Sequence, residues 1–150
     1  MKQNPAMLKA FSLKIQSKNS EFLKSTLKTS NETFHYIRQF YFDDIEIFES
    51  FFLLLLNRSN TTIGYVKISQ GGTAGTVVDL KIIAKYAVDS LASSVIIAHN
   101  HPSGNTSPSQ QDIELTKKCR QGLENLDIKL LDHLIMSDNN YLSFTDEGLL

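Results

Sequence analysis

The sequence predicts an α/β domain in which one mixed β-sheet is flanked by helices. Short apolar runs and segments of helical spacing follow one another, but without the strict strand–helix–strand order of a doubly wound fold. Neither the GxGxxG nor the P-loop spacing of a nucleotide-binding fold is present. The 150 residues, 41% of them apolar, suit a single domain with its own core. Within this domain, 1–150, we expect an edge strand and a helix over about 1–45 and the main core over 46–150.

The N-terminal part carries the signals of this strand and helix. Apolar and polar residues alternate over 11–15, which is typical of a half-buried strand, and Lys14 suits a sheet edge. Thr29 and Glu32 have the spacing of a capping box, so a helix is predicted over about 30–40.

The middle of the chain predicts a hairpin followed by a helix. Polar turn residues separate the apolar run 51–56 from the run 63–68, and the first strand is apolar enough to be buried on both faces. Apolar residues then recur at helical spacing over 80–91, and Asp79 is placed to cap that helix.

The C-terminal part predicts a strand, a long helix and two paired strands. A β-branched run over 94–98 ends at two histidines and a loop. Ser107, with a proline next and Gln110 at the capping-box position, predicts a helix that runs to about Leu126. The two further strands lie over 130–135 and 141–144.

The charge and the cysteine content restrict the class of protein. The 15 basic and 16 acidic residues leave a net charge of -1, so the chain has no excess positive charge to attract DNA. DNA is therefore a disfavoured partner. Cys119 is the one cysteine, its helical spacing indicates a buried position, and a disulfide framework is excluded. The longest apolar run, 51–56, is too short to cross a membrane, and no signal-peptide pattern is present. We expect a cytoplasmic protein without a membrane partner; the oligomeric state stays open.

The informative residues are two histidines and an aspartate. His99 and His101 stand at i and i+2 on extended backbone, which directs both imidazoles to one side. Asp112 returns from the next helix, and three such ligands leave a fourth position for water, as catalytic zinc requires. Taken singly, the histidines could be loop residues whose side chains bond to backbone groups. Asp112 alone could be an ordinary acidic residue in the first turn of a helix, where it stabilises the helix dipole. The complete pattern favours a zinc (Zn2+) site and makes 46–150 the metal-binding core.

Two further residues are predicted to act in catalysis. Ser109 lies three residues before Asp112, where its hydroxyl can stabilise a tetrahedral intermediate, although it also suits a plain first-turn residue. Glu49 precedes the buried strand and is assigned as general base, although it also suits a solvated acidic run. His133, beside Asp132, is interpreted as a strand residue that bonds to a buried partner. The alternative is that it lies behind a metal ligand and orients it.

The string from His99 to Asp112 fits the JAMM pattern of His-x-His-Pro, six residues, Ser, two residues and Asp at every position. With four further stretches, the chain resembles the RadC-like branch of the JAMM metalloproteases over roughly its last two thirds. These stretches are 69–72, 91–94, 131–135 and 144–150.

This resemblance implies a JAB/MPN fold, similar to the cytidine-deaminase architecture, with zinc on the two histidines and the aspartate. It also implies an upstream glutamate that activates water, which Glu49 matches better than Glu46. The expected activity is that of a metallopeptidase or isopeptidase on a peptide or protein substrate. Longer relatives carry a helix-hairpin-helix region that the first 45 residues or so do not show, so a borrowed DNA-binding role is not expected.

Two other functions compete with hydrolysis. A zinc deaminase requires a His-x-Glu motif and a Pro-Cys-x-x-Cys pair, and neither is present. A non-enzymatic or DNA-repair-associated accessory protein that retains the metal site stays open as the alternative, and the near-neutral charge disfavours it.

Overall fold

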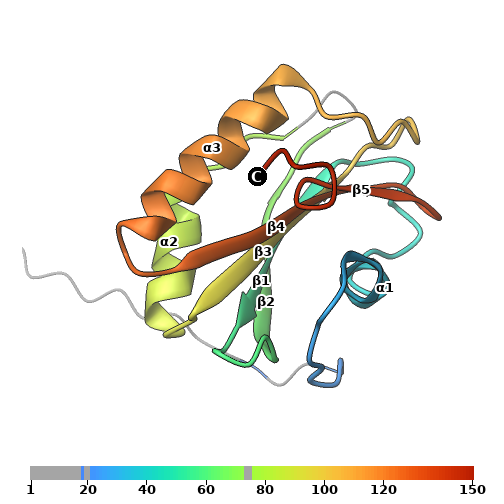
Figure 1. Ribbon diagram of the computed structural model, residues 1–150. Helices are drawn as coiled ribbons and strands as arrows, with labels where there is room; N and C mark the ends of the chain where they lie inside the picture. Colours follow the sequence, from blue (N-terminus) through green and yellow to red (C-terminus); the bar gives the residue numbers. More distant parts are fainter. Residues whose placement is uncertain (1–17, 19–20, 73–75) are drawn as a thin grey trace, which may run out of the picture.

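The computed structural model describes residues 18, 21–72 and 76–150, and their centre is one five-stranded sheet in the order β2-β1-β3-β4-β5 (Figure 1). Strands β3 and β4 run parallel and the other neighbours are antiparallel. The elements are α1 Ser30–Arg38, β1 Ser50–Leu56, β2 Thr62–Gln70, α2 Leu80–Asp89, β3 Ser94–Asn100, α3 Gln110–Glu124, β4 Lys129–Met136 and β5 Tyr141–Ser143. The predicted mixed sheet flanked by helices is confirmed.

Helices cover both faces of the sheet, with α2 and α3 on one face and α1 on the other (Figure 1). Every residue of β1 is buried because this strand is central and successive side chains enter opposite layers. Phe51, Leu53 and Leu55 pack in the layer of α2 and α3, and Phe52, Leu54 and Leu56 pack in the layer of α1. The predicted hairpin with a central first strand is therefore confirmed.

The starts of α1 and α2 follow the predicted caps. The Thr29 hydroxyl accepts the N–H of Glu32 at 3.1 Å, and the Glu32 carboxylate accepts the N–H of Thr29 at 3.2 Å. The Asp79 carboxylate accepts the N–H of Lys81 at 2.9 Å at the start of α2. In both helices the side chain satisfies a backbone donor that has no partner within the helix.

The predicted start and end of α3 are wrong by two residues. The cap is Ser109, whose hydroxyl accepts the N–H of Asp112, while the Asp112 carboxylate accepts the N–H of Ser109. A charged carboxylate is a stronger acceptor than the amide of Gln110, and the N–H of Ser107 is already bonded to Asn105. The helix ends at Glu124 instead of Leu126, before a turn that includes a positive φ.

The predicted strand over 11–15 lies outside the described residues. Among the helices of the described ranges, none is long and apolar enough to span a membrane.

Candidate metal centre

Strand β3 delivers both histidines to one end of the sheet. It extends to Asn100, two residues further than predicted, so His99 lies within the strand and His101 directly follows it. The N–H of His101 donates to the Met136 carbonyl at 2.9 Å, which continues the pairing with β4 and keeps the backbone extended. Alternation along this backbone directs His99 and His101 to the same side and Asn100 to the other.

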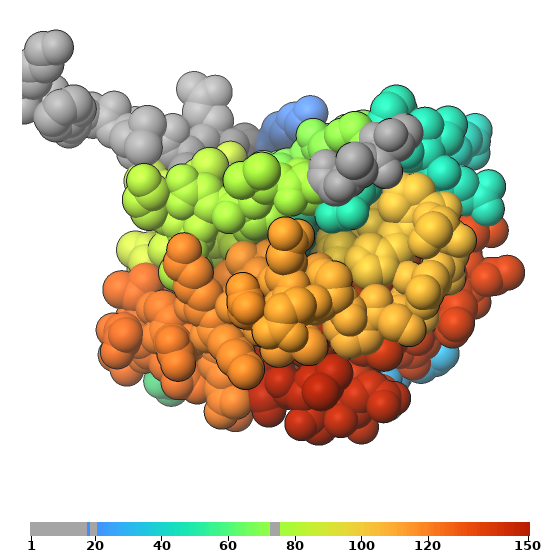
Figure 2. Space-filling model, turned by 90° about the horizontal axis from the view of Figure 1, so that it is seen from above, coloured from blue at the N-terminus to red at the C-terminus, as the bar shows by residue number. Residues whose placement is uncertain are grey.

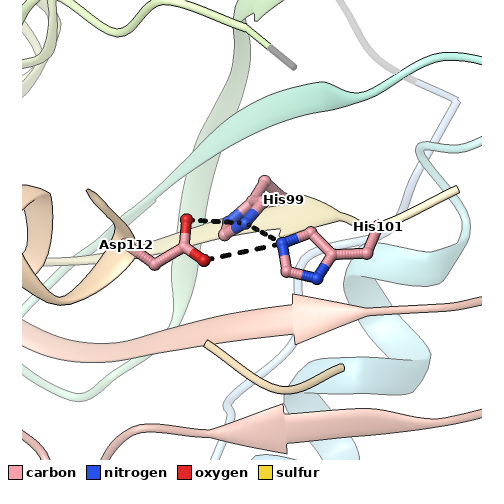
Figure 3. A group of neighbouring side chains, drawn as sticks. All are labelled: His99, His101 and Asp112. Atoms are coloured by element: carbon pink, nitrogen blue, oxygen red, sulfur yellow. Dashed lines mark hydrogen bonds and ion pairs between the residues drawn. The ribbon is translucent and has the colours of Figure 1, made fainter. Parts of the chain in front are cut away.

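Asp112, in the first turn of α3, faces both imidazoles (Figure 3). Its Oδ1 lies 3.1 Å from Nε2 of His99, and its Oδ2 lies 3.5 Å from Nε2 of His101. The two Nε2 atoms are 3.0 Å apart. Two imidazoles and a carboxylate, with their ligand atoms within 4.8 Å of one another, can hold a metal ion.

The ring orientation of His101 suits metal binding. Gly104, at φ 82°, closes a turn by donating its N–H to the His101 carbonyl. The Asn105 carbonyl then lies 2.7 Å from Nδ1 of His101. Because a carbonyl only accepts hydrogen bonds, Nδ1 carries a hydrogen, and the Nε2 of the neutral ring presents a lone pair to Asp112.

The charges at the site suit a cation. Three acceptor groups that face one another repel unless a proton or a metal ion lies among them. Without metal, the hydrogen bond to Asp112 raises the pKa of His101 against the opposing effect of burial. Burial alone would raise the pKa of Asp112, but hydrogen bonds from His101 and His99 hold it well below its ordinary value. The donor set therefore fits a divalent metal ion.

Glu49 and Ser109 line the same cleft as the three ligands, and the cleft has a volume of about 670 Å³. Figure 2 is a view toward this end of the molecule, where the loop before α3 and α3 itself lie side by side, in yellow and orange. The cleft walls also include the apolar residues Phe51, Val77, Val78 and Leu115. The structure thus brings all five predicted site residues together.

Ser109 has a structural role that sequence reasoning did not assign to it. Its hydroxyl oxygen accepts the N–H of Asp112 at 3.1 Å, and its own N–H donates to Oδ2 of Asp112 at 2.7 Å. The capping box therefore orients the carboxylate. Since the hydroxyl oxygen acts as acceptor in this contact, its hydrogen can be donated to a group in the cleft.

Asn100, between the two histidines, fixes the segment that carries Glu49. Its side chain is fully buried, and its Oδ1 accepts the N–H of Ser50 at 2.8 Å. Its Nδ2 donates to the carbonyls of Ile45 at 2.6 Å and Phe48 at 2.8 Å. Sequence reasoning missed this role because the only local signal was a polar residue inside a buried strand.

His133 contacts the cluster of His99, His101 and Asp112 from behind. Its Nε2 lies 2.9 Å from Nδ1 of His99, and its ring is fully buried. Burial, with a smaller effect of His99, lowers its pKa well below the ordinary value, so the ring is neutral. The structure therefore supports the alternative interpretation of His133, in which it lies behind a metal ligand.

A mixed sheet flanked by helices, with two histidines and an aspartate converging between the end of β3 and the start of α3, is consistent with a domain of the JAB/MPN kind. The chain belongs to the RadC-like JAB domain family, whose model matches residues 27–149. This match begins before the stretch over which the resemblance was seen in the sequence.

Proteins of the UPF0758 group are similar to this chain. The one from Flavobacterium johnsoniae is 46% identical over 101 residues, which cover 67% of this chain and 44% of the relative. The one from Porphyromonas gingivalis is 47% identical over 103 residues, covering 68% and 45%. The one from Fusobacterium nucleatum is 38% identical over 141 residues, covering 91% and 60%. The chain thus spans about half the length of these relatives.

Proposed function

We propose that this protein is a zinc-dependent metallohydrolase that cleaves an amide bond of a peptide or isopeptide. The observation that carries the proposal is the convergence of His99, His101 and Asp112 in a cleft that Glu49 and Ser109 also line. Membership of the JAB domain family, which includes metalloproteases, supports it.

Zinc is the proposed metal because it favours imidazole and carboxylate ligands and a tetrahedral arrangement. Three protein ligands leave one position for water, which is the arrangement of catalytic and not of structural zinc sites. A bound zinc ion lowers the pKa of water and polarises a carbonyl group, which is the chemistry that amide hydrolysis needs.

The side chains of the cleft supply the other parts of the reaction. The Glu49 carboxylate takes a proton from the attacking water and delivers it to the leaving amine. The Ser109 hydroxyl donates a hydrogen bond to the carbonyl oxygen as negative charge develops there. Apolar walls at Phe51, Val78 and Leu115 reduce the access of water, which strengthens these electrostatic contacts.

A peptide or protein is the proposed substrate and the cytoplasm the proposed location. The one cysteine, Cys119, is fully buried, and burial raises the pKa of its thiol to about 11. A thiol of this kind is consistent with a reducing compartment.

The test is hydrolysis of fluorogenic peptides and lysine-isopeptide conjugates by the zinc-loaded chain and by Glu49→Gln. We expect Glu49→Gln to retain zinc and lose at least about 100-fold in kcat, the usual contribution of a general base. Glu46→Gln is the matched control, because it removes an exposed acid three residues away. Undiminished hydrolysis by Glu49→Gln would remove Glu49 from the mechanism. A zinc-loaded wild type without any hydrolysis would favour the accessory-protein alternative.

A further inference from the structure

A chain of hydrogen bonds in the interior joins one metal ligand to the backbone of another. His99 Nδ1 lies 2.9 Å from Nε2 of His133, a residue of β4. His133 Nδ1 lies 2.6 Å from the hydroxyl oxygen of Thr116, a residue of α3. The Thr116 hydroxyl in turn lies 2.6 Å from the carbonyl oxygen of Asp112.

The chemistry of these groups fixes the direction of every bond. The Asp112 carbonyl only accepts, so the single hydrogen of the Thr116 hydroxyl is donated to it. The hydroxyl oxygen must then accept a hydrogen from Nδ1 of His133. Because a neutral imidazole carries one N–H, Nε2 of His133 is an acceptor and receives the hydrogen on Nδ1 of His99. When the ring of His99 is neutral, its one hydrogen is therefore on Nδ1, and Nε2 presents its lone pair to the metal site.

The surroundings keep this arrangement out of contact with water. His99 and Thr116 are each 2% exposed and His133 is fully buried. Phe51 stacks on the ring of His99, with ring centroids 6.0 Å apart, and Phe144 stacks on His133 at 4.7 Å. Water is therefore excluded from the hydrogen bonds among His99, His133 and Thr116. It cannot replace one of these partners and so stabilise the opposite tautomer.

We propose that Thr116 and His133 are positioning residues that set the tautomer and the ring orientation of His99 for metal binding. This inference rests on the metal site of the proposed function but not on hydrolysis. With the reverse tautomer, a hydrogen on Nε2 of His99 would face Asp112 and His101 and block the lone pair that a metal requires.

The direct test is a two-bond nitrogen–hydrogen NMR spectrum of the histidine rings in the wild-type chain, recorded with and without zinc. We expect His133 to carry its hydrogen on Nδ1 in both states and His99 to carry its hydrogen on Nδ1 when zinc is bound. A hydrogen on Nε2 of His133 would overturn the proposal. A chain that takes up no zinc would contradict the proposed function. The spectrum of that chain would still report the tautomer of His133 and so would still test the present proposal.

A matched pair of variants tests the consequence for the metal. Thr116→Val keeps the shape and removes the hydroxyl, whereas Thr116→Ser keeps the hydroxyl. Zinc affinity is measured by competition with a chromophoric chelator, and the cobalt-substituted proteins are compared by visible absorption. We expect Thr116→Val to bind zinc about 10- to 100-fold more weakly, with an altered cobalt spectrum, and Thr116→Ser to stay near the wild type. Wild-type affinity and spectrum in Thr116→Val would overturn the proposal.

Discussion

Replacement of Asn100 by alanine tests whether this side chain supports the segment that carries Glu49. The change removes the partners of the Ser50 N–H and of the Ile45 and Phe48 carbonyls. Ser50 and Ile45 are 2% and 4% exposed, whereas Phe48 is 38% exposed, so water can replace the partner at Phe48. Each buried group left without a partner costs about 1–3 kcal/mol, so the expected loss of stability is about 3 kcal/mol.

The assay is urea unfolding of the two chains, monitored by circular dichroism. A loss of about 3 kcal/mol lowers the urea midpoint by roughly 1–3 M, given the usual slopes for small domains. Asn139→Ala is the control, because Asn139 is exposed, and it should lie within about 0.5 kcal/mol of the wild type. A loss below about 1 kcal/mol for Asn100→Ala would refute the argument that buried backbone groups depend on this side chain. Because Asn100 anchors the Glu49 segment, the variant should also lose more in kcat than in zinc affinity.

Three further predictions concern the cap, the charges and the thiol. Ser109→Ala should lower stability by about 1 kcal/mol in urea unfolding and Ser107→Ala hardly at all, because the cap is Ser109; equal losses would contradict this. In metal-free protein, the raised pKa of His101 contributes stability that is fully present below pH 6.5 and is lost as the pH rises. The depressed pKa of Asp112 contributes stability that is lost in acid, as the pH falls below its ordinary pKa of 3.8. Thermal unfolding with a chelator should therefore show a loss of stability above pH 6.5 that added zinc removes; a flat profile without metal would oppose this. Cys119 should react with a thiol reagent only on unfolding, and rapid labelling of the native chain would contradict its burial.

The fold was predictable from the sequence where local patterns and burial agree. The apolar run of β1 indicated a strand covered on both faces, and the structure confirms it. The capping box of Thr29 and Glu32 and the cap at Asp79 began helices where predicted. The convergence of His99, His101 and Asp112 was predictable because His99 lies near the end of β3, His101 directly follows that strand, and Asp112 lies in the first turn of the next helix.

The rest depended on contacts between segments far apart in the chain. His133 reaches His99 through the parallel pairing of β3 with β4, in which it lies opposite Ile97, and a single sequence does not specify that register. Asn100 acts on backbone groups 50 or more residues away, which leave no local trace. The start of α3 was misplaced because two serines compete for the cap, and the carboxylate of Asp112 favours the second.

The most direct test of the metal site is the metal content of the purified chain, measured by plasma mass spectrometry beside a His99→Ala, His101→Ala double variant. We expect zinc at close to one equivalent in the wild type and its loss in the variant, because two of the three ligands are removed. A wild type that stays metal-free after zinc is supplied, or a variant that retains as much zinc, would contradict the site.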